Sequence, residues 1–215
     1  MIPLTDVSRR PTSFPIVTLT LIVINFVVFI VELTNGDAFV LKWAMIPAHV
    51  AAGEDLITIL TAMFMHASWS HILGNMVFLW AFGPEIEDAM GPARYAIFYV
   101  LGGFAAAAAQ VAFAPHSTVP NLGASGAIAA VMGAFLVTFP RDNIRTILVI
   151  FVFIRVTYIP ALILIGFWFL LQLWNAGSIA PQESTGVAYL AHVGGFLFGA
   201  VFARLFERGS RIAGR

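Results

Sequence analysis

A serine and a histidine, each placed inside an apolar segment, are the residues of this chain best suited to chemistry. Ser125 lies in PNLGASG (120–126), at the start of an apolar stretch that is predicted to be helical to about Phe139. His192 lies in AHVGG (191–195), near the start of another apolar stretch. A neutral imidazole that accepts the hydroxyl proton turns a serine into a nucleophile. The pair therefore predicts a Ser-His dyad that hydrolyses a substrate.

Small residues follow one face of each of these two predicted helices. Side chains three and four residues apart share a face of a helix, and this spacing connects Ser125, Ala129 and Gly133 in the first helix and His192, Gly195 and Gly199 in the second. Helices that face each other through small residues can approach more closely than the usual distance of about 8–10 Å. We therefore expect the hydroxyl to reach the imidazole.

Two further polar residues are suited to assist the reaction. His71 and Asn75 stand at positions i and i+4 of an apolar segment and so share a helix face. An imidazole and a carboxamide are suitable hydrogen-bond donors to an oxyanion, although a hydrogen-bonded pair between helices is the competing interpretation. The segments of Ser125 and His192 contain no Asp or Glu, so we predict a dyad without a carboxylate. His66 is expected to shape the neighbouring loop.

Each of these signals also has a simpler interpretation. A GASG pattern in a membrane helix is typical of close packing, and a lone histidine is often a satisfied polar residue or a member of a proton relay. Three functions stay open: a serine hydrolase, a non-catalytic binder of transmembrane helices, and a metal or proton transporter that uses His66, His71 and His192. The lack of intramembrane carboxylates, the usual partners of cations, disfavours the transporter.

The composition of the chain predicts that it lies in a membrane. Of its 215 residues 60% are hydrophobic and 10% are charged, whereas soluble domains have about 25% charged residues. Cysteine is absent, which excludes disulfides, a thiolate nucleophile and cysteine-ligated metal centres. We predict a polytopic membrane protein and expect no metal, no cofactor and no nucleic-acid partner.

The apolar runs are close to the roughly 20 residues that a bilayer core requires. They predict an all-α bundle of six transmembrane helices in a single domain, 1–215, with spans at about 16–33, 69–83, 93–113, 122–139, 160–174 and 187–206. A short lead (1–15) and a basic tail (207–215) flank the bundle. The first external loop (34–65) is predicted to lie partly in the membrane, and 144–159 is interpreted as a β-branched segment at the interface that leads into the fifth span.

The basic residues predict the orientation of these spans. Lys42 is the only basic residue on one side, and the other ten of the eleven Lys and Arg residues fall on the opposite side. Because basic residues accumulate in cytoplasmic loops, both termini are predicted to be cytoplasmic. The fourth and sixth spans then run in parallel, which places Ser125 and His192 roughly 5–10 Å below the outer boundary at about 1.5 Å per residue.

Together these residues resemble the rhomboid family of intramembrane serine proteases. The resemblance covers roughly residues 60–206 and rests on four short patterns, namely GASG with Gly123 and Gly126, AH (191–192) followed by Gly195 and Gly199, HILGN (71–75), and G-x-x-x-E-x-x-x-G with Gly83, Glu87 and Gly91. It implies cleavage of peptide bonds in or near the transmembrane helices of other membrane proteins. Ser125 is implied as nucleophile, His192 as general base, and His71, Asn75 and the Ser125 amide as oxyanion donors.

The resemblance also implies roles outside the reacting atoms. Glu87 is implied to be structural, and a sideways route for the substrate makes Phe167 and Trp168 a possible gate. The implied partners are the lipid bilayer and transmembrane substrates, with the oligomeric state left open. We expect a multi-pass protein of a prokaryotic plasma membrane.

The chain departs from the rhomboid pattern at two places. Ile57 and Thr58 stand where family members have a Trp-Arg pair in the first external loop. Ala129 stands where many members have a tyrosine that stacks on the histidine. Both the anchoring of this loop and the group that orients His192 are therefore questions for the structure.

Overall fold

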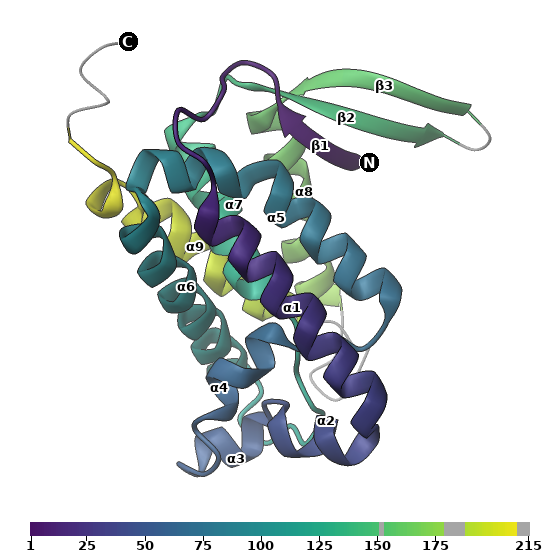
Figure 1. Ribbon diagram of the computed structural model, residues 1–215. Coiled ribbons are helices and arrows are strands. Elements are labelled where there is room, and N and C mark those ends of the chain that lie inside the picture. Colours follow the sequence, from purple (N-terminus) through teal and green to yellow (C-terminus); the bar gives the residue numbers. More distant parts are fainter. Residues whose placement is uncertain (151–152, 179–187, 210–215) are drawn as a thin grey trace.

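The body of the protein is a bundle of long helices (Figure 1). The structure, a computed structural model, describes residues 1–150, 153–178 and 188–209. The long helices in these ranges are α1 (Ile16–Asn35), α5 (Trp69–Met90), α6 (Pro92–Phe113), α7 (Ser125–Thr138), α8 (Ala161–Ser178) and α9 (Tyr189–Phe206). Four of them, α1, α6, α8 and α9, are long and apolar enough to cross a membrane, and α7 is a shorter apolar helix of 14 residues. A mostly helical, multi-pass membrane protein is thereby confirmed.

Helix α7 forms the centre of this bundle. It packs against α5, α6, α8 and α9, and every residue from Gly126 to Phe135 is buried. A helix that is apolar on all sides has no face suited to water and is stable only when other elements surround it. The sequence of small and apolar residues in α7 therefore explains its central position.

Glycines allow α9 to lie directly against the backbone of α7. A Cβ atom added at Gly199 would lie 1.9 Å from the carbonyl oxygen of Ala130, and one added at Gly195 would lie 2.1 Å from that of Gly126. A Cβ at Gly133 of α7 would likewise lie 2.2 Å from the carbonyl oxygen of Phe196. These contacts bring the two helices closer than any larger residue would allow.

Glu87 joins the start of α1 to α5. Its carboxylate accepts hydrogen bonds from the backbone N–H groups of Val17 and Thr18, at 2.9 and 2.8 Å, and from the Thr18 hydroxyl, at 2.8 Å. The predicted end of the second span at Gly83-Pro84 is wrong, because α5 continues through Pro84 to Met90. Gly91 then ends the helix at φ +80°, in the left-handed region that favours glycine.

Short helices cover the end of the bundle near the loop 114–124. They are α2 (Asp37–Trp43), α3 (Pro47–Ala51), α4 (Thr58–Thr61) and the 3₁₀ helix η1 (Ala62–Phe64). Met45 and Asn121 exchange two backbone hydrogen bonds, of 3.0 and 2.7 Å, and the Gly123 N–H donates to the Ala62 carbonyl at 2.9 Å. These backbone hydrogen bonds thus anchor the first external loop (34–65) to the loop 114–124, in a chain that has no Trp-Arg pair at 57–58.

A small antiparallel sheet lies at the opposite end, so the all-α prediction is wrong in this part. The strands are β1 (Ile2–Asp6), β2 (Asn143–Ile150) and β3 (Phe153–Pro160), in the order β1-β2-β3. The β2–β3 hairpin extends sideways from the bundle (Figure 1). Residues 143–160 are rich in β-branched and aromatic residues, which favour strands. The predicted interfacial segment (144–159) therefore forms most of a hairpin. The predicted polar lead (1–15) supplies β1, the third strand of the sheet.

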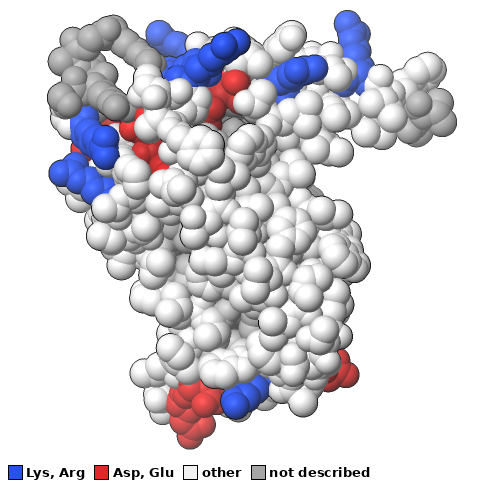
Figure 2. Space-filling view, viewed as in Figure 1, with Lys and Arg blue, Asp and Glu red and all other residues white. Residues whose placement is uncertain are grey.

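Charged residues gather at the two ends of the molecule. Figure 2 shows Lys and Arg side chains, with acidic side chains among them, around the end that carries the sheet, further charged side chains at the other end, and an uncharged body between the two. The N-terminus and the end of α9 both lie at the sheet end (Figure 1). Part of the predicted basic tail, 210–215, lies outside the described residues, as does most of the predicted loop 175–186.

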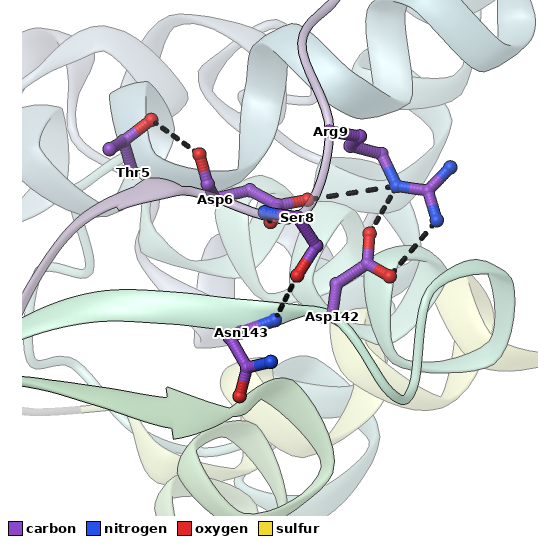
Figure 3. A network of polar contacts seen from close by, with 6 residues as sticks. All are labelled: Thr5, Asp6, Ser8, Arg9, Asp142 and Asn143. Carbon is purple, nitrogen blue, oxygen red and sulfur yellow. Dashed lines mark hydrogen bonds and ion pairs between the residues drawn. The ribbon is translucent and has the colours of Figure 1, made fainter.

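A polar network connects β1 to the turn before β2 (Figure 3). The Arg9 guanidinium donates two hydrogen bonds to the Asp142 carboxylate and lies 3.7 Å from the Asp6 carboxylate. The Asp6 carboxylate accepts from the Ser8 N–H at 2.7 Å, and the Ser8 hydroxyl accepts from the Asn143 N–H at 2.7 Å. Burial raises the pKa of Asp6 to about 7, and Asp142 adds to this shift, whereas the Ser8 N–H and Arg9 oppose it.

Replacement of Asp6 by asparagine is expected to reduce the pH dependence of stability. The folded protein binds the Asp6 proton more tightly than the unfolded chain does, so this stabilisation is complete below about pH 4 and is lost as the pH rises through about 7. Thermal unfolding in detergent should therefore show a steeper fall in midpoint for the wild type than for Asp6→Asn between about pH 5 and about pH 8. Asp37→Asn, at an exposed position of α2, is the control. Equal slopes for wild type and Asp6→Asn would contradict this expectation.

Candidate active site

Ser125 and His192 meet at one end of the α7–α9 contact. Ser125 is the first residue of α7, and His192 lies in the first turn of α9. The distance between His192 Nε2 and Ser125 Oγ is 2.8 Å, a normal hydrogen-bond length. Gly195, one turn further along α9, allows this approach because its missing side chain leaves room for the backbone of Gly126.

His71 lies beside the same serine. Its Nδ1 atom accepts a hydrogen bond from the Ala67 N–H at 3.4 Å, so in the neutral imidazole Nε2 carries the proton. A Cβ atom at Gly123 would lie 2.9 Å from His71 Nε2 and 3.7 Å from Ser125 Oγ. Gly123 has φ +131°. Because Gly123 has no side chain, only its backbone lies next to the side chains of His71 and Ser125. The His71 N–H donor therefore faces the neighbourhood of the Ser125 hydroxyl.

Asn75 and the Ser125 amide offer further donors. Asn75 is 9% exposed, and its side-chain amide nitrogen has no hydrogen-bond partner among the described residues. An unsatisfied buried donor is costly, and active sites are among the places where one occurs. The N–H of Ser125 belongs to the first turn of α7, where helical hydrogen bonding leaves N–H groups free. An oxygen that gains negative charge is the type of group that these donors suit.

His66 lies behind His71, with its ring centroid 5.0 Å from that of His71. It is buried, and burial lowers its pKa to about 4, so it is neutral near pH 7. The backbone N–H of His66 donates to the carboxylate of Glu32 at 2.9 Å. His66 thus connects the loop before α5 to α1 through its backbone and packs its ring against His71.

His192 also contacts two residues of α8. The sequence did not indicate that either of them is a partner of the dyad. The His192 Nδ1 atom lies 2.8 Å from the side-chain oxygen of Gln172, and the Trp168 ring centroid lies 5.8 Å from that of the imidazole. Trp168 thus supplies an aromatic neighbour on the histidine in a chain that has Ala129 in place of tyrosine. The available signal was a lone amide in an apolar span, placed four residues after a tryptophan.

The expected gate residues have different surroundings. Phe167 is 47% exposed on the outer side of α8. Trp168 instead packs against His192 and Phe196. Only Phe167 is therefore placed on the surface of the bundle.

A small cavity of about 60 Å³ adjoins the serine. Its wall consists mostly of small residues and methionine, with the side-chain amides of Gln110 and Asn121, and includes Met63, Gly103, Ala106, Ser125 and Ala191. The cavity offers room for a small group next to the hydroxyl.

The fold and the site define a polytopic membrane protein in which a serine and a histidine meet inside a helical bundle. The chain belongs to the rhomboid family, because the Rhomboid domain matches residues 53–208. This confirms the resemblance found in the sequence patterns.

Several relatives share this similarity. The chain is 28% identical over 171 residues to Rhomboid protein 1, mitochondrial, of Saccharomyces cerevisiae. This match covers 74% of this chain and 46% of that protein. It is 32% identical over 103 residues to Rhomboid protease GluP of Bacillus subtilis, covering 48% and 20% respectively. It is 31% identical over 145 residues to the human Presenilin-associated rhomboid-like protein, mitochondrial, covering 65% and 35%. The chain thus spans less than half the length of each of these relatives.

The expected location in a prokaryotic plasma membrane is wrong. The relatives from S. cerevisiae and human, and RHOMBOID-like protein 6 of Arabidopsis thaliana, are named as mitochondrial proteins. The asymmetry of basic residues distinguishes the two sides of a membrane, but it carries no information on which membrane this is. The assignment of both termini to a cytoplasm is withdrawn for the same reason, whereas the multi-pass character is supported.

Proposed function

We propose that this chain is an intramembrane serine endopeptidase that cleaves peptide bonds in or near the transmembrane helices of other membrane proteins. The observation that carries this proposal is the 2.8 Å contact between His192 Nε2 and Ser125 Oγ. Membership of the rhomboid family, which includes a relative named as a protease, supports it.

The proposed reaction begins when His192 Nε2 accepts the hydroxyl proton of Ser125 while Oγ attacks the scissile carbonyl carbon. The carbonyl oxygen becomes negatively charged and is stabilised by N–H donors from His71, Asn75 and the Ser125 backbone. His192 then returns the proton to the leaving amine, and an acyl-enzyme remains. Water, activated by the same imidazole, attacks the ester carbonyl and releases the second product and free Ser125.

The proposed setting of this reaction is a single domain in which all six long helices lie in the membrane. Helices α5 and α7 would cross it although they are less apolar or shorter than the other four, because neighbouring helices cover them. The dyad would then lie below the surface that is covered by α2, α3 and α4. The small cavity at Ser125 favours a substrate with a small side chain next to the cleaved bond.

A fluorophosphonate probe tests the proposal directly, because it reacts with activated serines. The wild type, purified in detergent, is expected to become labelled, and Ser125→Ala is expected to remain unlabelled. Ser70→Ala, which removes an exposed hydroxyl near the start of α5, should label like the wild type. Labelling must also survive EDTA. A wild type that is folded but does not label would overturn the proposal and favour a non-catalytic binder of transmembrane helices.

Replacement of Phe167 by alanine is expected to increase the rate of cleavage of a membrane-embedded substrate several-fold. Phe167 would form the outer wall of a sideways route, and a smaller residue would widen this route. Trp168→Ala is expected to have the opposite effect, because it removes the ring beside His192. The measurement is the initial rate in reconstituted vesicles. Equal rates for Phe167→Ala and wild type would remove Phe167 from the proposed gate.

A further inference from the structure

We propose that Gln172 is a positioning residue that holds His192 in the tautomer required of a general base. This inference rests on the proposed function for its catalytic consequence. The contact itself, between the Gln172 side-chain oxygen and His192 Nδ1 at 2.8 Å, is independent of that function.

The tautomer of His192 follows from its two contacts. A neutral imidazole has one N–H donor and one nitrogen that accepts. An amide oxygen only accepts, so its contact with Nδ1 requires that Nδ1 carries the proton. Nε2 is then left with a free lone pair directed at the Ser125 hydroxyl, 2.8 Å away. With the proton on Nε2 instead, the imidazole would be unable to accept the serine proton.

The orientation of the Gln172 amide is set by its own helix. The amide nitrogen of Gln172 donates to the carbonyl oxygen of Trp168, one turn earlier in α8, at 3.4 Å. This bond directs the N–H₂ group along the helix and leaves the oxygen for His192. Gln172 is 8% exposed, so a reversed amide would set its oxygen against the Trp168 carbonyl oxygen, two acceptors facing each other, and lose this hydrogen bond in a buried place.

An amide suits this position better than a carboxylate does. The segments that carry the dyad contain no Asp or Glu, and an ionised carboxylate inside the bundle would have a large desolvation cost. A neutral amide orients an imidazole without this cost, as the asparagine does in papain-like Cys-His-Asn sites. Three helices thus hold the dyad and its neighbours: α7 supplies Ser125, α9 supplies His192, and α8 supplies Gln172 and Trp168.

The direct test is the tautomer of His192, measured by ¹⁵N NMR of histidine-labelled protein in detergent micelles. The chain has five histidines, and the resonances absent from His192→Gln identify those of His192. We expect a protonated Nδ1 in the wild type and a mixture of tautomers in Gln172→Leu, which has a similar volume but no amide. Gln172→Asn, whose shorter side chain fails to reach Nδ1, should give the same mixture. Gln172→Glu restores an oxygen acceptor and should restore the Nδ1-protonated form.

Kinetics supply the second readout. Gln172→Leu is expected to reduce kcat by about 10- to 100-fold with little change in KM, because a misplaced catalytic group weakens the transition state rather than substrate binding. Leu170→Ala, at an exposed position of the same helix, is the control and should leave kcat unchanged. An unchanged His192 tautomer in folded Gln172→Leu and Gln172→Asn would overturn the inference. If the wild type neither labels nor cleaves, the proposed function fails, and the NMR result still decides the role of Gln172.

Discussion

Replacement of Ser125 by alanine is expected to reduce the cleavage rate by about six orders of magnitude. The variant lacks the Oγ atom that would form the proposed acyl-enzyme, and His192 Nε2 loses its partner at 2.8 Å. The deleted hydroxyl lies at the very start of α7, so the helix packing is retained. The measurement is the initial rate of cleavage of a transmembrane substrate, followed on a gel, at equal amounts of folded protein.

The loss should not increase further when His192 is also replaced. Members of a catalytic unit are strongly non-additive, so Ser125→Ala, His192→Ala and the double variant are expected to have similar residual rates. Ser70→Ala is again the matched serine control. Two single variants whose losses multiply in the double variant would show that Ser125 and His192 act independently, which would contradict a dyad.

Replacement of Gly195 by alanine is expected to reduce activity by about 100-fold or more. A Cβ atom at this position would lie 2.1 Å from the carbonyl oxygen of Gly126, which is backbone and has no rotamer with which to move away. Helix α9 must therefore shift away from α7, next to the residue that follows Ser125. A shift of about 1 Å lengthens the Ser125–His192 contact beyond hydrogen-bonding distance, and displacements of this size cost about 100-fold in rate.

The same variant should unfold at a lower temperature, because the separated helices lose packing contacts. Gly166→Ala is the matched control, since a Cβ atom at Gly166 in α8 meets nothing within 4 Å. Cleavage, probe labelling and thermal unfolding are measured on both variants. A Gly195→Ala protein with wild-type activity would mean that close contact between α7 and α9 is not required for the reaction.

The patterns of the sequence indicated the positions of the long helices, but not where each ends. A proline usually ends a helix, so Pro84 predicts that the helix stops there. Helix α5 instead continues to Met90, because the hydrogen bonds of Glu87 to the start of α1 stabilise the helical turns after Pro84. The strands β2 and β3 lie in a segment whose β-branched residues were visible. Their pairing with β1 was not, because Ile2 and Ile147 are far apart in the chain and come together only in the folded protein.

The candidate site shows the same division. The residue types and the spacing of His71, Asn75, Ser125 and His192 were enough to predict a dyad and two oxyanion donors. Gln172 and Trp168 were missed as partners of His192, since nothing in their own segment indicates which helix they face. Trp168 was instead assigned to a possible gate, whereas the structure places its ring beside the imidazole.

The membrane setting, the apolar helices, the candidate residues for chemistry and the family could be read from the amino-acid sequence, because hydropathy, spacing and short patterns are properties of local sequence. Folding was needed to show that Gly195 brings α9 against α7, that Gln172 reaches Nδ1 of His192, and that residues 2–6 complete a sheet. These contacts depend on the rotation and separation of elements distant in the chain. Packing of the whole bundle sets both.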